Sequence, residues 1–103
     1  MTAKRICKVV RRRDPSMPGA YKYSRWVYRV VECLEGQQGF LNERGVRLVW
    51  ESDFVTYRGG PKDHQQRALA SAIAALGNRA LAVGLEPGTP LGIISDREQE
   101  VLS

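Results

Sequence analysis

Aromatic and cationic side chains alternate along residues 21–29, and this segment has the clearest chemical potential in the sequence. Arginine and lysine neutralise phosphates, while aromatic rings and guanidinium planes stack on exposed bases at about 1–3 kcal/mol per base. A strand over this segment would project alternate side chains from one sheet face. We therefore expect a nucleic-acid or partner-binding surface formed by Arg11, Arg12, Arg13, Tyr21, Lys22, Tyr23, Arg25, Arg29 and Arg47.

The same residue types also occur where no nucleic acid binds, so the sequence leaves two classes of partner open. Tyrosine and arginine are preferred hot-spot residues of protein interfaces, and tyrosine is also common on solvated strands. The partner is therefore expected to be either nucleic acid or an acidic protein or nucleoprotein complex. Long strands with exposed edges also make a homodimer compatible with either partner.

Positive charge is concentrated towards the start of the chain. The whole sequence carries 16 Lys and Arg residues against 11 Asp and Glu residues. Residues 1–29 hold nine of the basic residues and a single acid, Asp14, so residues 30–103 have a net charge of −3. A local field of this sign attracts polyanions. Twelve of the basic residues are arginine, whose planar guanidinium suits phosphate geometry.

Residues suited to catalysis do not form a recognisable set. His64 is the single histidine, and no nucleophile or nucleotide-binding motif accompanies it. Glu51 and Asp53 share a predicted strand face and would suit a divalent ion in a nuclease, but no following element such as Glu-x-Lys supports that site. We therefore expect a protein that is not an enzyme and that uses no cofactor or metal.

The two cysteines, Cys7 and Cys33, are expected to be buried free thiols. A hairpin of the first two strands around residues 14–20 would place Cys7 opposite residues near 28, too far from Cys33 for a disulfide. The sequence has neither the apolar run of a signal peptide nor a stretch of about 20 apolar residues. We therefore expect a cytoplasmic protein without a membrane partner.

Three segments show the alternation and the β-branched or aromatic content that are typical of strands. Loops rich in glycine and proline separate them. We expect these segments to form an antiparallel three-stranded sheet within one small basic domain that spans residues 1–103. The strands are predicted over residues 4–13, 21–35 and 46–57.

One main α-helix is expected to pack on this sheet, which gives the α+β class. Helix formers predict it over residues 62–76, with Gly77 and Asn78 as its C-terminal stop. The pattern of residues 79–94 favours a hairpin that would extend the sheet, although the first half also suits a helix. A capping box predicts a short C-terminal helix over residues 95–102.

Alternation separates a core face from a binding face on the second strand. The opposite face from the core is expected to expose Arg25 and Arg29 and to become apolar further along. On the third strand, Leu48 and Trp50 are expected to share a face. The core face of the second strand is predicted to hold Trp26, Tyr28, Val30 and Leu34. The apolar stripe of the helix is predicted to be Leu69, Ile73 and Leu76.

The order of three strands and a helix is similar, at the level of fold only, to that of plant ethylene-response-factor and phage-integrase arm-binding domains. Residues 94–102 resemble the opening of the helix-turn-helix domain of LuxR-type regulators. We expect a small non-enzymatic binding protein whose basic, aromatic sheet face engages nucleic acid. The alternative is a protein-targeted regulator or inhibitor of mobile-element (phage-like) type that acts on a host nucleic-acid machine such as a CRISPR defence complex.

Overall fold

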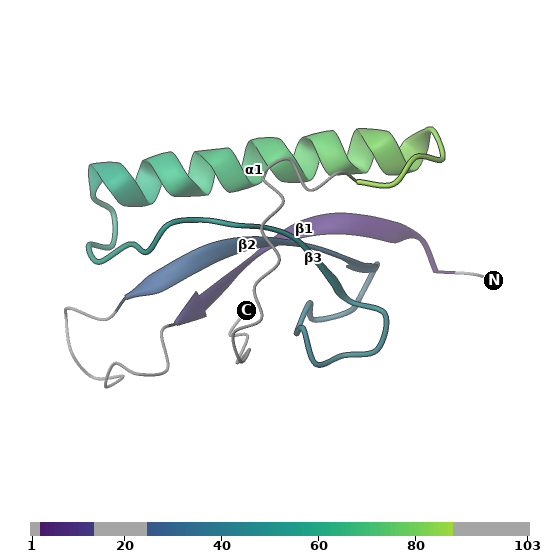
Figure 1. The fold of residues 1–103 in the computed structure, drawn as a ribbon, viewed down its shortest axis with the longest axis horizontal. Helices are drawn as coiled ribbons and strands as arrows, with labels where there is room; N and C mark the ends of the chain where they lie inside the picture. Colours follow the sequence, from purple (N-terminus) through teal and green to yellow (C-terminus); the bar gives the residue numbers. More distant parts are fainter. Residues whose placement is uncertain (1–2, 14–24, 88–103) are drawn as a thin grey trace.

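The computed structural model describes residues 3–13 and 25–87, which form an antiparallel three-stranded sheet packed against one long helix (Figure 1). This arrangement confirms the predicted α+β class. The expected helix at 95–102 and the second half of the expected 79–94 hairpin lie outside the described residues. The elements are β1 (Arg5–Arg13), β2 (Trp26–Leu34), β3 (Arg47–Glu51) and α1 (Pro61–Ala82).

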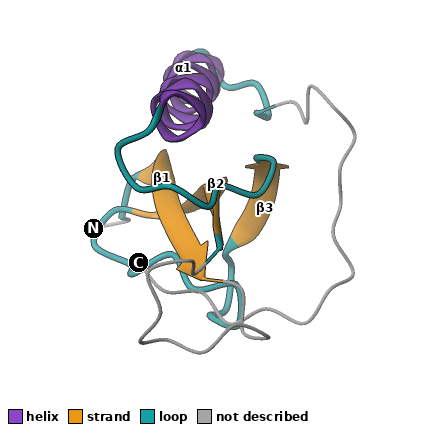
Figure 2. Ribbon diagram, turned by 90° about the vertical axis from the view of Figure 1, so that its left-hand side faces the viewer, coloured by secondary structure: helices purple, strands orange, loops and turns teal. Residues whose placement is uncertain are grey.

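The strand β2 occupies the middle of the sheet, with β1 on one side and β3 on the other (Figure 2). Its aromatic and β-branched residues suit a pleated surface that is covered on both sides. Every residue of β2 is buried except Leu34, which is half-buried. The helix α1 packs on one face, and a second apolar cluster, supplied by β1, β3 and the loop after β2, packs on the other.

The main core lies between the sheet and α1. Trp26, Tyr28 and Val30 are buried there together with Trp50, which confirms the core face predicted for those residues of β2. Burying large aromatic and branched side chains supplies most of the free energy that holds a helix on a sheet.

An extra residue in β3 changes the faces that alternation predicts for that strand. Val30 pairs with Trp50, whereas Val31 pairs with Leu48, so Val49 has no counterpart in β2 and forms a β-bulge. Trp50 therefore joins the core beneath α1, while Leu48 packs with Val31 on the opposite face. The prediction that Leu48 and Trp50 share a face is wrong.

The strand β3 is also shorter than the predicted strand at 46–57, because a side chain replaces one of the two backbone hydrogen bonds of the next residue pair. The backbone N–H of Tyr28 donates to Ser52 Oγ at 2.8 Å. The Ser52 N–H still donates to the Tyr28 carbonyl at 2.8 Å. The chain then rejoins the sheet through a single bridge between Val55 and Trp26.

The helix α1 extends to Ala82, so the predicted stop at Gly77 and Asn78 is wrong, as is the strand expected in the first half of 79–94. Gly77 lies where α1 packs closely on β1: a Cβ added there would lie 2.6 Å from the Cys7 Sγ. The glycine is therefore explained by close packing and does not end the helix.

Small and polar residues, and not large apolar ones, form the buried face of α1. Of the predicted stripe, Leu69 and Leu76 are 44% and 54% exposed, and only Ile73 packs against the core. The predicted stripe is therefore wrong for both leucines. Short side chains let the helix axis approach the sheet, which already supplies the bulky residues. The buried residues of α1 are Asp63, Gln66, Ala70, Ala74 and Gly77.

Both cysteines are free and buried, as expected, but the predicted register around Cys7 is wrong. Cys7 lies opposite Glu32, and Cys33 lies opposite Ile6. The thiols are near each other along the ladder but project from opposite faces of the sheet, since one joins the core beneath α1 and the other the second cluster. Burial raises the pKa of both thiols.

Candidate functional site

The face of β2 that was predicted to bind a partner is not open to solvent. The Arg29 side chain is 0% exposed, and its Nε donates to Glu51 Oε2 at 2.7 Å. Its neighbours Val27 and Val31 are 1% and 0% exposed. The prediction that Arg29 is exposed is therefore wrong. The physical reason is that the register places Glu51 of β3 opposite it, and a buried guanidinium needs such a carboxylate.

Of three further predicted site residues, one is buried and two are held by other side chains. Arg12 is 4% exposed. The Arg25 guanidinium lies over the Phe54 ring, 4.7 Å from its centroid, which is the geometry of a cation–π contact. Arg47 donates to Glu32 from Nε and Nη2 at 3.0 and 2.8 Å. None of these three guanidinium groups is offered freely to a ligand.

Arg11 and Arg13 are the predicted site residues that the structure leaves exposed on β1. Their register partners in β2 belong to the core face, so both side chains project from the side of the sheet on which α1 lies. Tyr21, Lys22 and Tyr23 lie outside the described residues.

A groove between β1 and α1 brings Arg11 together with two arginines that lie outside the predicted site. Arg58 comes from the turn before α1, and Arg67 comes from the second turn of α1. We call this feature the arginine groove, and its volume is about 530 Å³. Its lining residues are Lys8, Val9, Val10, Arg11, Tyr28, Arg58, Arg67 and Ser71.

The charge of the arginine groove is of one sign. Within the described part of the chain, no aspartate or glutamate is among its lining residues. Lys8 also lines the groove, but its Nζ donates to the Gln37 carbonyl at 3.0 Å. The charges free to meet a ligand are therefore those of Arg11, Arg58 and Arg67. Like charges gathered along a concave surface focus a positive potential that attracts anions.

A buried hydrogen-bond network holds the N-terminal end of α1 on the sheet beside this groove. Asp63 in the first turn of α1 accepts from the Tyr28 hydroxyl at 2.5 Å and from Trp26 Nε1 at 3.3 Å. Its other oxygen accepts from the Gly59 N–H at 2.8 Å, which fixes the turn that carries Arg58. The network thus positions the walls of the arginine groove.

The same network shifts the pKa values of its two acids in opposite directions. Burial opposes the ionisation of Asp63, but hydrogen bonds from Tyr28, Gly59 and Trp26 outweigh it and hold its pKa below the ordinary value. Burial, together with the bond to Asp63, raises the pKa of Tyr28. Tyr28 therefore acts as a neutral donor, and Asp63 as a charged acceptor, at neutral pH.

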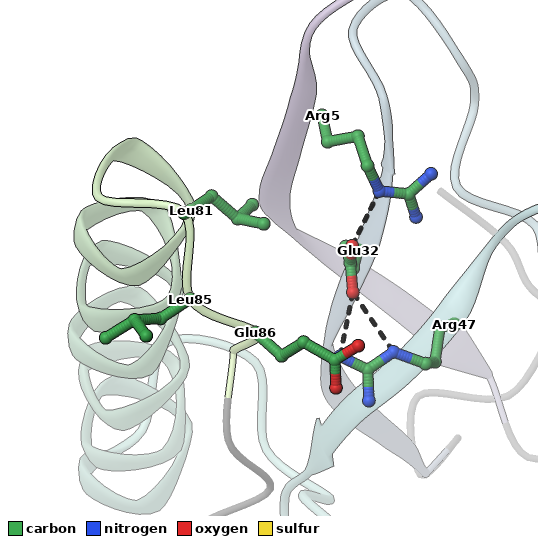
Figure 3. A pocket seen from close by; sticks show the side chains of 7 residues that line it. Arg5, Glu32, Arg47, Leu81, Leu85 and Glu86 are labelled. Atoms are coloured by element: carbon green, nitrogen blue, oxygen red, sulfur yellow. Dashed lines mark hydrogen bonds and ion pairs between the residues drawn. The ribbon is translucent and has the colours of Figure 1, made fainter.

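A second pocket of about 450 Å³ lies near the other end of α1, where four charged residues gather (Figure 3). Arg5 Nε donates to one oxygen of Glu32 at 2.6 Å, and Arg47 donates to the other. Burial opposes the ionisation of Glu32, but these bonds prevail and lower its pKa. Glu86 also lines this pocket, so two carboxylates balance two guanidinium groups. This cluster links the three strands and carries no excess charge.

The described residues show no cluster of metal ligands. No group of three or more His, Cys, Asp or Glu residues within residues 3–13 and 25–87 could hold a metal ion. Glu51 is buried against Arg29, whereas Asp53 is exposed, so these two acids do not form an open pair. In the same part of the chain, no helix is long and apolar enough to cross a membrane.

Arg58 and Arg67 were missed because they belong to the part of the sequence that carries net negative charge. Their importance comes from the packing of α1 across β1, which brings residues far apart in sequence into one groove. No local pattern in the sequence predicts such an arrangement. No protein family, curated protein or solved structure matches this chain.

Proposed function

We propose that this chain is a small non-enzymatic binding protein that engages nucleic acid through the arginine groove. The observation that carries the proposal is the convergence of Arg11, Arg58 and Arg67 from three separate segments, with no acid among the described lining residues. Arginine forks match phosphate oxygens in geometry and charge, and phosphate contacts supply most of the affinity for nucleic acid.

The proposed mode of binding relies on phosphates more than on stacked bases. Trp26 and Tyr28, which are the aromatic residues of β2, are 8% and 7% exposed and face α1. Arg13 is exposed beyond the groove on the same strand and would extend the path of positive charge. We therefore expect binding that is strongly salt-dependent and only weakly selective for base sequence.

A salt titration with matched variants tests this proposal. The variant Arg11→Ala/Arg67→Ala removes two charges from the groove, and the control Arg44→Ala/Arg79→Ala removes two exposed charges elsewhere. In mobility-shift assays at several salt concentrations, the groove variant should lose at least about tenfold in affinity. Its slope of log K against log salt should become shallower by about two units.

The control variant keeps the net charge of the groove variant, so it separates a local site from general attraction. It should retain most of the wild-type affinity and slope. Equal losses in both variants, or no binding by the wild-type protein at low salt, would contradict the proposal.

The second candidate is a regulator or inhibitor that targets a protein, including one of phage-like type that acts on a CRISPR or other nucleic-acid machine in the cytoplasm. The position of β1 at one edge of the sheet favours this candidate, because such edges recruit strands of other proteins. A complex that survives nuclease treatment of a native lysate would support this candidate against the first. Light scattering on the purified protein would test a homodimer.

A further inference from the structure

The strand β1 forms one edge of the sheet, and its outward backbone groups can be identified from a contact with α1. The Cys7 N–H donates to Asn78 Oδ1 at 2.7 Å, and Asn78 Nδ2 donates to the Cys7 carbonyl at 3.0 Å. The side-chain amide of Asn78 thus occupies both backbone groups of Cys7 as a neighbouring strand would. These groups therefore point away from β2.

Alternation of the antiparallel ladder extends this assignment along the strand. If the groups of Cys7 point outward, then those of Val9, Arg11 and Arg13 do so as well. No residue within 3–13 and 25–87 forms a hydrogen bond with the outward N–H and carbonyl groups of Val9 or Arg11. Asn78 closes the edge at Cys7, and with respect to the described residues the edge is open at Val9 and Arg11.

The open part of the edge is also a wall of the arginine groove. Val9 and Arg11 line the groove from β1, while Arg67 and Ser71 line it from α1. A strand edge that faces a helix across a groove is the arrangement in which an extended peptide adds to a sheet. The peptide would pair with the edge through its backbone and would direct alternate side chains towards α1.

We propose that this edge accepts an extended acidic segment of a partner protein as a fourth strand, paired with Val9 and Arg11. The carboxylates of that segment would lie against Arg58 and Arg67. This inference goes beyond nucleic-acid binding and does not require it. Charge complementarity selects the occupant, since the described lining of the groove has free positive charge and no acid.

Charge also argues against a second copy of this chain as the occupant. Pairing β1 with its own copy would bring Arg11 and Arg13 of each chain next to the same residues of the other, and like charges on paired strands destabilise a sheet. An acidic strand turns the same residues into attractive cross-strand and groove contacts.

Amide hydrogen exchange measured by NMR tests the backbone pairing directly. The probe is a short capped peptide in which glutamate and valine alternate, and its control is the same peptide with N-methyl groups on alternate amides. With the first peptide, the amides of Val9 and Arg11 should exchange at least about tenfold more slowly. The amide of Cys7, which already bonds Asn78, should change little. The N-methylated peptide should not protect Val9 or Arg11.

Matched charge reversals test the groove. Arg67→Glu places a negative charge in the groove, and Arg79→Glu places one on an exposed part of α1 outside it. The first variant should bind the peptide at least about tenfold more weakly, while the second should stay within about threefold of the wild-type protein.

The remaining outcomes separate this inference from the proposed function. Peptide binding without protection of Val9 and Arg11, or equal binding of the N-methylated peptide, would overturn strand addition. Protection that rises with protein concentration in the absence of peptide would overturn it in favour of a second copy. If the protein binds an oligonucleotide but not the peptide, strand addition is overturned and the proposed function stands. If it binds the peptide but no oligonucleotide, strand addition stands and the proposed function is overturned.

Discussion

The guanidinium of Arg29 and the carboxylate of Glu51 form an ion pair inside the protein, with both side chains almost fully excluded from water. Removing one partner leaves the other charge buried and uncompensated, which costs about 3–5 kcal/mol. We therefore expect Arg29→Ala to lower the free energy of unfolding by this amount in urea denaturation. The loss would concern stability and not direct contact with a ligand.

The paired variant Arg29→Met/Glu51→Leu provides the control, because it removes both charges and keeps apolar volume. It should be close to the wild-type protein in stability, since replacing a buried ion pair with apolar residues is often neutral or stabilising. If Arg29→Ala unfolds at the wild-type urea concentration, the pair is not buried as described.

The two tryptophans are both buried, but their indole N–H groups differ. Trp26 Nε1 donates to Asp63 at 3.3 Å, whereas no hydrogen-bond acceptor for Trp50 Nε1 is found among the described residues. Either change to alanine should lower the free energy of unfolding by about 3–5 kcal/mol. Trp50→Phe should recover most of that loss, and Trp26→Phe should recover less because it breaks a bond to Asp63.

Urea denaturation of these four variants makes the comparison, with Tyr57→Ala as the control for an aromatic side chain that is 67% exposed. The control should stay within about 0.5 kcal/mol of the wild-type protein. Equal effects of the two phenylalanine variants would count against the role assigned to the Trp26–Asp63 bond.

Gly77 is a second position where the packing of α1 can be tested. Alanine favours a helix over glycine by about 1 kcal/mol, but the new Cβ would meet the Cys7 Sγ at 2.6 Å. Overpacking of a tight core usually costs about 1–3 kcal/mol, so we expect Gly77→Ala to reduce stability in thermal unfolding. The substitution Cys7→Ala removes the sulfur atom that the new Cβ would meet. In that background, Gly77→Ala should therefore lower stability less than it does in the wild-type protein. Independent, additive effects would contradict the close contact.

Alternation predicted the fold well where the two faces of a strand differ in kind. It placed Trp26 and Tyr28 in the core correctly. It failed for Arg29 because β2 is the central strand and both of its faces are buried, which alternation alone does not reveal. From sequence alone, a charged residue such as Arg29 is predicted to be exposed, because its buried partner Glu51 lies on another strand.

The candidate site was predicted only in part, since it depends on contacts between distant segments. Arg11 was selected from the basic N-terminal run, but the groove also needs Arg58 and Arg67, which β1 meets only after α1 folds across the sheet. The bulge at Val49 shows the same limitation. One extra residue places Trp50 and Leu48 on opposite faces of the sheet, although the sequence still alternates as in a regular strand.

Acid should weaken the network that positions the arginine groove, and the sign follows from Asp63. Its folded pKa lies below the ordinary value of about 3.9, so its contribution to stability is complete well above that value and is lost as pH falls through the folded pKa. Asp63→Asn should therefore lower stability at pH 7 and flatten the decline of stability below about pH 4. Urea denaturation at a series of pH values measures both effects, with Asp53→Asn as the matched control at an exposed carboxylate. If the stability of Asp63→Asn falls with decreasing pH as steeply as that of the wild-type protein, then protonation of Asp63 is not what destabilises the protein in acid.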